Sequence, residues 1–166
     1  MDIRIGQGVD VHAFIDVEDP GALERPLRLA GVTIDGPLAL AGHSDADVVL
    51  HALVDALLGA AGAGDLGSLV GVDRDETAGA DSALFVDQAL DVLDRAGLRV
   101  GNVDLTVIAQ KPRLGPHRDA MQHRVAELLH VDAGRVSIKA TTTDRLGFIG
   151  RGQGVACLAI ASLVSD

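Results

Sequence analysis

The stretch that decides the fold runs from residue 42 to residue 67 and reads GHSDADVVLHALVDALLGAAGAGDLG. Ser44 is a residue type that accepts hydrogen bonds from the first free N–H groups of a helix, and Asp47 three residues later completes a variant of the capping box. The sequence therefore predicts a helix that begins at Asp45.

Polar residues interrupt the apolar body of this helix at regular intervals. Between Ala46 and Ala60 nearly every residue is apolar except Asp47, His51 and Asp55, which recur every four residues. That spacing places the three side chains on one stripe of a mostly buried helix. Glycines then end the helix, and Gly64–Gly67 turns the chain.

His51 has two interpretations. A single buried histidine is usually satisfied by a neighbouring polar group, whereas a catalytic metal site would combine it with a second histidine and a carboxylate. Residues 3–14 are predicted to form a strand, and Asp10 and His12 lie two apart on one face of it. The three residues form a candidate ligand set, although the short spacing of Asp10 and His12 alone is weak support.

Composition limits the class of protein. The 166 residues, 48% of them apolar, suit one domain with a real core, and the single Cys157 excludes an internal disulfide and fits a reducing compartment. The first residues lack a signal-peptide pattern, and no apolar run approaches the roughly 20 residues that span a bilayer. We therefore expect a cytoplasmic protein without a membrane partner. A net charge of −10 argues against nucleic acid, and an acidic protein that binds phosphates must neutralise them locally.

The remaining chain alternates between strands and helices, and its last strand is apolar on both faces. Helices are expected to cover one face of the sheet and copies of the same chain the other. The predicted elements are a strand at 27–34, an irregular acidic segment at 67–79, a helix at 80–96, a strand at 99–110, a helix at 118–129, a strand at 135–143 and a strand at 155–164.

Two loops between these elements carry chemistry with open interpretations. Residues 111–117 (KPRLGPH) are the most basic stretch of the chain, and they are either an ordinary exposed turn or part of a site. Thr141–Asp144 offers three hydroxyls and a carboxylate, which suit a diphosphate with a divalent cation. Threonine is also common at strand ends because of its β-propensity.

Four stretches together carry a resemblance to a known family: DVH at 10–12, the stretch at 42–67, IAQKPR at 108–113 and TTTDRLGFIGRG at 141–152. In this order they resemble the 2-C-methyl-D-erythritol 2,4-cyclodiphosphate synthases of the non-mevalonate isoprenoid pathway. The match extends over most of the chain. The resemblance implies that residues 1–166 form a single cyclodiphosphate synthase domain.

The resemblance also implies an architecture and a reaction. The subunit would be a single-domain α/β sandwich of the α+β class, with a mainly four-stranded sheet, in a homotrimer whose active sites lie between subunits. It would be a phosphorus–oxygen lyase acting on the nucleotide 4-diphosphocytidyl-2-C-methyl-D-erythritol 2-phosphate. The 2-phosphate attacks the β-phosphate, assisted by two divalent metals, and CMP leaves. An isoprenoid diphosphate in the cavity on the trimer axis is a further partner to consider.

Site residues follow from the resemblance position by position. Asp10, His12 and His51 match the family's zinc ligands, Asp144 matches the ligand of a second ion, Mg²⁺ or Mn²⁺, and Thr142 joins these four in the catalytic set. His43 and Ser44 match residues that contact the 2-phosphate, and residues 65–67 match residues that contact the erythritol. Residues 109–115 match the loop of the neighbouring subunit that holds the cytidine, and residues 141–143 match the residues that hold the diphosphate. The substrate-binding positions are Asp10, His12, His43, Ser44, Asp65, Leu66, Gly67, Ala109, Lys111, Pro112, Arg113, Leu114, Gly115, Thr141, Thr142, Thr143, Asp144, Phe148 and Arg151.

Four departures from the family pattern occur, three at single residues and one over a segment. Asp144 replaces a glutamate and is one methylene shorter, and Arg113 replaces a lysine, which changes a point charge into a planar fork. Residues 70–74 (VGVDR) replace a segment that commonly reads FPDTD, and Gln153 replaces a glutamate beside the arginine at 151.

Two other functions would use the same residues. A zinc phosphoesterase would need a general base for water, and no unassigned histidine or glutamate lies in a motif that suggests one. A non-catalytic trimer would bind isoprenoid diphosphates in its axial cavity. Release of CMP from the cytidine substrate distinguishes the synthase from the binding protein.

Overall fold

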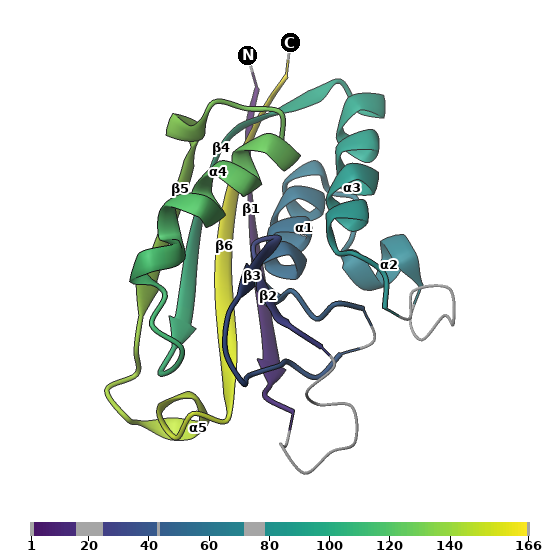
Figure 1. Cartoon of the computed structure of the whole chain (residues 1–166). Coiled ribbons are helices and arrows are strands. Elements are labelled where there is room, and N and C mark those ends of the chain that lie inside the picture. Colours follow the sequence, from purple (N-terminus) through teal and green to yellow (C-terminus); the bar gives the residue numbers. More distant parts are fainter. Residues whose placement is uncertain (1, 16–24, 43, 72–78, 166) are drawn as a thin grey trace.

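The computed structural model describes residues 2–15, 25–42, 44–71 and 79–165. Its centre is a four-stranded sheet in the order β1-β6-β4-β5 (Figure 1). Strand β6 pairs antiparallel with both of its neighbours, whereas β4 and β5 are parallel. The strands are β1 (Ile3–Ala13), β4 (Leu98–Ala109), β5 (Val136–Thr141) and β6 (Gly154–Ser165).

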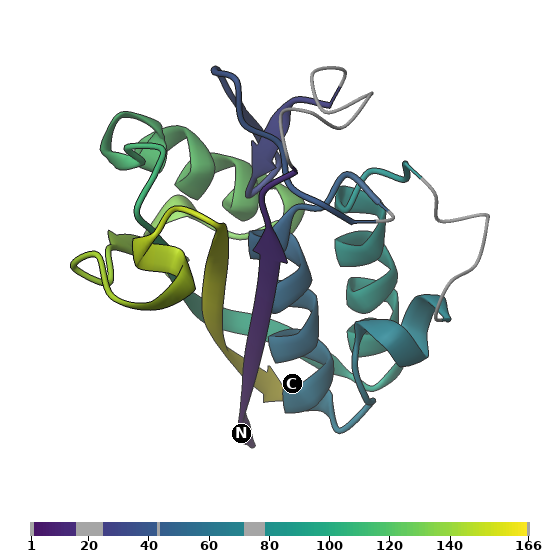
Figure 2. The same ribbon diagram turned by 90° about the horizontal axis from the view of Figure 1, so that it is seen from below.

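The register of the sheet brings three strand ends to one edge. Val155 of β6 pairs with His12 of β1 on one side and with Ala109 of β4 on the other. Since adjacent strands are about 4.8 Å apart, His12 and Ala109 lie about 10 Å from each other. Next to them Ile108 pairs with Thr141 at the end of β5. Segments far apart in the sequence therefore meet at this edge, which Figure 2 views from below.

Helices cover one face of the sheet and enclose the core. Helix α1 (Val48–Ala61) packs against β1 and β6, α3 (Ala83–Arg95) packs on α1, and α4 (Arg118–Leu128) packs on β5. Strand β4 alternates buried and less buried residues along its length, as a half-covered strand should. Within the described residues, no helix is long and apolar enough to cross a membrane.

Two glycines explain how closely α1 approaches β1. A Cβ atom built at Gly6 would lie 2.0 Å from the carbonyl oxygen of Ala56, and one at Gly8 would lie 1.9 Å from that of Ala52. No side chain fits in that space, so the glycines let the backbones of the helix and the strand nearly touch. Asp10 continues the same face of β1 and is therefore held directly beside α1.

The opposite face of β1 is apolar and open. The exposed fraction is 62% for Ile3, 64% for Ile5, 53% for Val9 and 47% for Val11, and Ile160 on β6 is 47% exposed. The period-two apolar pattern that predicted this strand thus lies on the uncovered side, while the glycines face the core. The prediction that helices cover only one face of the sheet is confirmed.

Several predicted boundaries are wrong. The central helix begins at Val48 with Asp47 as its N-cap, three residues later than predicted. Residues 27–34 form two short strands, β2 (Leu27–Leu29) and β3 (Val32–Ile34), because Ala30 and Gly31 between them take positive φ angles and reverse the chain.

Short helices occupy segments for which no helix was predicted. Helix α2 (Leu66–Val70) forms at the start of the segment 67–79, where the Asp65 carboxylate accepts a hydrogen bond from the N–H of Ser68 at 2.7 Å. Helix α5 (Gly147–Gly150) lies before β6, and single 3₁₀ turns at Gly115–His117 and Ala133–Arg135 flank α4.

Candidate metal centre

Three potential metal ligands converge where β1 meets α1. Asp10 and His12 come from β1 and His51 from the first turn of α1. Asp10 Oδ2 lies 2.9 Å from His12 Nε2 and 3.1 Å from His51 Nδ1, and the two ring nitrogens lie 3.2 Å apart. Within the described ranges these residues form a group of donors that could hold a metal ion.

The geometry of this cluster fits a divalent ion such as zinc. Zinc binds imidazole nitrogen and carboxylate oxygen at about 2.0–2.1 Å, so two donors of a tetrahedral site are separated by about 3.3 Å. The observed separations are close to that value. Two nitrogens and one oxygen are also the donor set of many catalytic zinc sites, which leave one position open.

The electrostatics of the cluster keep its carboxylate ionised. Burial alone would raise the pKa of Asp10, but the hydrogen bonds and charges of His12 and His51 outweigh it and hold the pKa well below its ordinary value. Burial would lower the pKa of His12, whereas Asp10 and the carbonyl of Ala41 raise it above the ordinary value. The site therefore offers a charged oxygen ligand at neutral pH.

Outer contacts orient both rings. His12 Nδ1 bonds to the carbonyl oxygen of Ala41, which turns Nε2 toward Asp10. His51 Nε2 lies 3.1 Å from Ser44 Oγ and 3.0 Å from Ser82 Oγ, which turns Nδ1 toward Asp10. Ligand histidines in metal sites usually have such partners on the second nitrogen.

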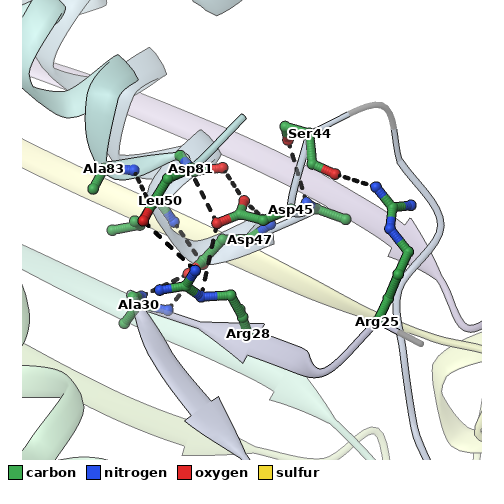
Figure 3. A network of polar contacts seen from close by, with 12 residues as sticks. Arg25, Arg28, Ala30, Ser44, Asp45, Asp47, Leu50, Asp81 and Ala83 are labelled. Atoms are coloured by element: carbon green, nitrogen blue, oxygen red, sulfur yellow. Dashed lines mark hydrogen bonds and ion pairs between the residues drawn. The ribbon is translucent and has the colours of Figure 1, made fainter. Parts of the chain in front are cut away.

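Asp47 and Arg25 fix the segments that present these residues (Figure 3). The buried Asp47 carboxylate accepts from the N–H of Val49 and Leu50 in α1 and from the N–H of Ala30 and Gly31 in the β2–β3 turn. The Arg25 guanidinium donates to the carbonyl of Ser44 at 2.6 Å. A helix start, a hairpin and a loop are thus tied together behind the cluster.

A pocket of about 560 Å³ opens at the same edge of the sheet. Its walls combine the end of β4 and the loop after it with the end of β5. The predicted site residues that line it are Ala109, Pro112, Arg113, Leu114, Gly115, Thr141 and Thr142. The loop after β4 and the threonines at the end of β5, about 30 residues apart in the sequence, therefore line the same pocket.

The other predicted site residues in the described part of the chain do not line this pocket. Asp65, Leu66 and Gly67 surround the start of α2, and Thr143 bonds to the carbonyl of Leu146 at 2.6 Å. Lys111 lies over the Phe14 ring, 5.5 Å from its centroid. His43 and residues 72–74 of the departing segment lie outside the described residues.

The turn after β5 carries Asp144, Phe148 and Arg151. Asp144 has a φ of 51°, a left-handed conformation that aspartate tolerates better than most residues, and its side chain lies 3.3 Å from Thr142 Oγ1. Phe148 on α5 is 47% exposed. Arg151 Nε donates a hydrogen bond to Gln153 Oε1 at 3.3 Å, so the glutamine that replaces the family's glutamate still contacts the arginine.

Sequence reasoning missed Ser82, Asp45 and Ala41 as parts of the site. Ser82 lies 31 positions from His51 in the sequence and looks there like an ordinary helix start. Nothing in the pattern around it indicates that its hydroxyl reaches a histidine on another helix. Backbone carbonyls such as that of Ala41 have no sequence signal at all.

The fold and the site together define an α+β protein with a candidate metal centre at one edge of its sheet and a pocket that opens at the same edge. The chain belongs to the YgbB family, whose sequence model matches residues 3–164. It is 51% identical over 162 residues to the 2-C-methyl-D-erythritol 2,4-cyclodiphosphate synthase of Shouchella clausii, with 97% of each chain covered. It is thus an enzyme of the cyclodiphosphate synthase family.

Some relatives are longer, and this chain matches less than half of their length. It is 49% identical over 164 residues to the bifunctional enzyme IspD/IspF of Erythrobacter litoralis, covering 99% of this chain but 41% of that enzyme. The bifunctional IspDF structure from Campylobacter jejuni matches with a TM-score of 0.90 at 41% identity, over 99% of this chain and 43% of that one. The Plasmodium falciparum IspF structure, a CDP complex, matches with a TM-score of 0.84 at 33% identity, over 99% and 97% of the chains.

Proposed function

We propose that the chain converts 4-diphosphocytidyl-2-C-methyl-D-erythritol 2-phosphate into 2-C-methyl-D-erythritol 2,4-cyclodiphosphate and CMP, as a phosphorus–oxygen lyase of isoprenoid precursor synthesis. Residues 1–166 act as one domain in this proposal. The observation that carries it is the convergence of Asp10, His12 and His51 into one group of potential metal ligands. The cyclodiphosphate synthases among its relatives support the choice of reaction.

Asp10, His12 and His51 are proposed to hold zinc. When bound, the ion supplies positive charge that polarises a phosphate oxygen. The chain's contribution is to keep three donors in place before the substrate arrives, since β1, α1 and the outer contacts of both rings fix them. The depressed pKa of Asp10 keeps its carboxylate available over the neutral range.

The pocket at the ends of β4 and β5 is proposed to bind the cytidine and diphosphate. A matching synthase structure was solved with CDP in the bound form, which supports a nucleotide at this fold. Ala109–Gly115 would enclose the base of a substrate bound at the neighbouring subunit's metal centre, with Arg113 as a cation, and Thr141–Thr143 would hold the diphosphate through hydroxyl groups. Asp144 would hold the second ion, Mg²⁺ or Mn²⁺, which would offset the negative charge of the phosphates.

The opposite end of the substrate is proposed to lie at the start of α1. Ser44 and His43 would bind the 2-phosphate near the helix N-terminus, where backbone dipoles favour anions. Asp65, Leu66 and Gly67 would contact the erythritol. Because one phosphate of the substrate attacks another, these groups need only bend the substrate and offset charge repulsion.

Assembly completes the proposal. The open apolar face of β1 and β6 is the surface that we expect to be covered in a homotrimer, with active sites between subunits. Phe148 and Arg151 would lie near the substrate and the central cavity, where an isoprenoid diphosphate is a further candidate ligand. We expect the enzyme to act in the cytoplasm.

Metal content and CMP release test the proposal together. The purified chain should contain one zinc per subunit and release CMP from the cytidine substrate in the presence of Mg²⁺. Asp10→Ala and His51→Ala should lose both properties while the far-UV circular dichroism stays unchanged. His123→Ala is the matched control, since this exposed histidine on α4 bonds only to the carbonyl of Asp119 among the described contacts. Full zinc content in His51→Ala would overturn the ligand assignment.

A further inference from the structure

Two hydroxyl groups meet the outer nitrogen of the His51 ring. Ser82 Oγ lies 3.0 Å and Ser44 Oγ 3.1 Å from Nε2, and Ser82 is fully buried. If Nδ1 binds a metal, the neutral ring carries its proton on Nε2, and that proton needs an acceptor. Which hydroxyl must act as the acceptor depends on where its own proton goes.

The hydroxyl proton of Ser82 is committed to Asp45. Ser82 Oγ donates to Asp45 Oδ1, and the Ser82 backbone N–H donates to Asp45 Oδ2 at 3.2 Å. An ionised carboxylate only accepts hydrogen bonds, so the Ser82 oxygen faces His51 with its lone pairs. Ser44 Oγ accepts from the N–H of Ala46 at 3.2 Å and keeps its proton for another acceptor, such as the phosphate of the proposed substrate.

Asp45 is itself held in place. Its backbone N–H donates to the carbonyl of Ala80 at 3.0 Å, and the Arg28 guanidinium lies between two carboxylates, 3.9 Å from Asp45 Oδ2 and 3.5 Å from Asp81 Oδ2 (Figure 3). The segment before α3 is therefore fastened to the segment before α1. Ser82 joins the two segments to the His51 ring.

The hydroxyl of Ser82 is not used as its position would suggest. Serine directly before a helix usually caps the free N–H groups of the first turn. Among the described contacts Ser82 makes no side-chain cap, and Asp81 Oδ1 accepts from the N–H of Ala83 at 2.9 Å instead. The helix start thus leaves the Ser82 hydroxyl to Asp45 and His51.

We propose that Ser82 is a positioning residue of the metal centre: with Asp45 behind it, it holds the ring proton of His51 on Nε2 and directs the Nδ1 lone pair at the ion. The inference rests on the proposed metal site. Loss of such an outer contact typically weakens metal binding about 10- to 100-fold. We expect Ser82→Ala to fall in that range.

The test compares zinc affinity and the ring proton of His51 in four proteins. Zinc dissociation constants are measured by competition with a chelator for the wild type, Ser82→Ala, Ser82→Thr and Asp81→Asn. Asp81→Asn is the control because Asp81 lies at the same helix start and contacts Arg28, as Asp45 does, but has no contact with His51 among the described contacts. In parallel, ¹H–¹⁵N spectra of the zinc-loaded proteins follow the Nε2 proton of His51, whose exchange with water a hydrogen bond slows.

We expect Ser82→Ala to bind zinc at least about tenfold more weakly and to lose the protected ring proton, Ser82→Thr to restore both, and Asp81→Asn to leave both unchanged. Equal affinity and an equally protected proton in Ser82→Ala would overturn the inference while leaving the metal site intact. A wild-type protein that binds no zinc would overturn the site itself. If Ser82→Ala does not fold, Asp45→Ala, which removes both carboxylate oxygens and with them the acceptor of the hydroxyl proton, must weaken zinc binding in the same way.

Discussion

Replacing Asp47 should destabilise the protein more than any surface aspartate. The Asp47 side chain is 0% exposed, and its carboxylate accepts hydrogen bonds from two N–H groups of α1 and two of the β2–β3 turn, at 2.6 to 3.1 Å. Asp47→Ala leaves these donors buried without a partner. Both the helix that carries His51 and the hairpin that packs on it lose their shared anchor.

The magnitude follows from opposing terms. A hydrogen bond to a charged group contributes about 1.5–3 kcal/mol, so the set contributes roughly 6–12 kcal/mol before the carboxylate is desolvated. Burial raises the pKa of Asp47 although the N–H groups of Gly31, Leu50 and Ala30 oppose it, which shows that desolvation is substantial. Removing one partner of such a buried group costs about 3–5 kcal/mol. Asp47→Asn keeps one acceptor oxygen and should cost about half as much.

Guanidinium chloride unfolding of the metal-free protein measures this loss. The wild type and variants are compared at one protein concentration, because an oligomer unfolds in a concentration-dependent way. Asp87→Ala is the control, since this exposed residue on α3 should change the free energy of unfolding by less than about 0.5 kcal/mol. A loss below about 1 kcal/mol in Asp47→Ala would refute the reasoning.

Three further predictions concern packing, pH and assembly. Gly8→Ala should lower the free energy of unfolding by more than about 3 kcal/mol, because its Cβ would lie 1.9 Å from a carbonyl oxygen of α1. Gly59→Ala, whose Cβ would have its nearest atom at 3.8 Å, should raise the free energy of unfolding by about 0.5–1 kcal/mol. Denaturant titrations that give both variants the same sign would contradict this account of the β1–α1 contact. Burial and nearby carboxylates raise the pKa of Asp55 above 3.8, so its ionisation weakens the folded state as the pH rises through that range. Asp55→Asn should therefore gain stability relative to the wild type as the pH rises from acid, where Asp55 is protonated in both states, to neutral, and a pH-independent difference between their unfolding curves would exclude this. Ile160→Lys on the open sheet face should shift sedimentation from an oligomer to a monomer, while Leu84→Lys on α3, which is 53% exposed, should not; an unchanged sedimentation coefficient in Ile160→Lys would count against that face as the interface.

The candidate group of Asp10, His12 and His51 could be anticipated because each part depends on local periodicity. Asp10 and His12 alternate on a strand, and His51 follows the four-residue stripe of a helix, so both faces are visible in the sequence. That the strand and the helix meet at these residues was known only through the resemblance to a family. The structure supplies the physical reason, which is the pair of glycines that let β1 approach α1.

The start of α1 shows where local rules are insufficient. Ser44, Asp45 and Asp47 are all good N-cap residues, and the sequence cannot rank them. Tertiary contacts decide, since the Asp47 carboxylate also bonds to the turn at Ala30 and Gly31. Local rules also fail at Ser82. They predict an N-cap there, but the Ser82 hydroxyl contacts His51, 31 positions away in the sequence.

The apolar pattern of β1 could be predicted, but its orientation could not. Isoleucines and valines at every second position indicate a strand. In the structure these residues lie on the open side, and the glycine-containing face packs on the helix.

Phosphorus NMR of the purified protein with the cytidine substrate, zinc and magnesium tests the central claim most directly. We predict the signals of a cyclic diphosphate together with an equimolar amount of CMP, and neither signal in the His51→Ala variant. CMP with a linear phosphate product would indicate hydrolysis instead of cyclisation. No reaction by a folded protein that contains zinc would contradict the proposed synthase activity.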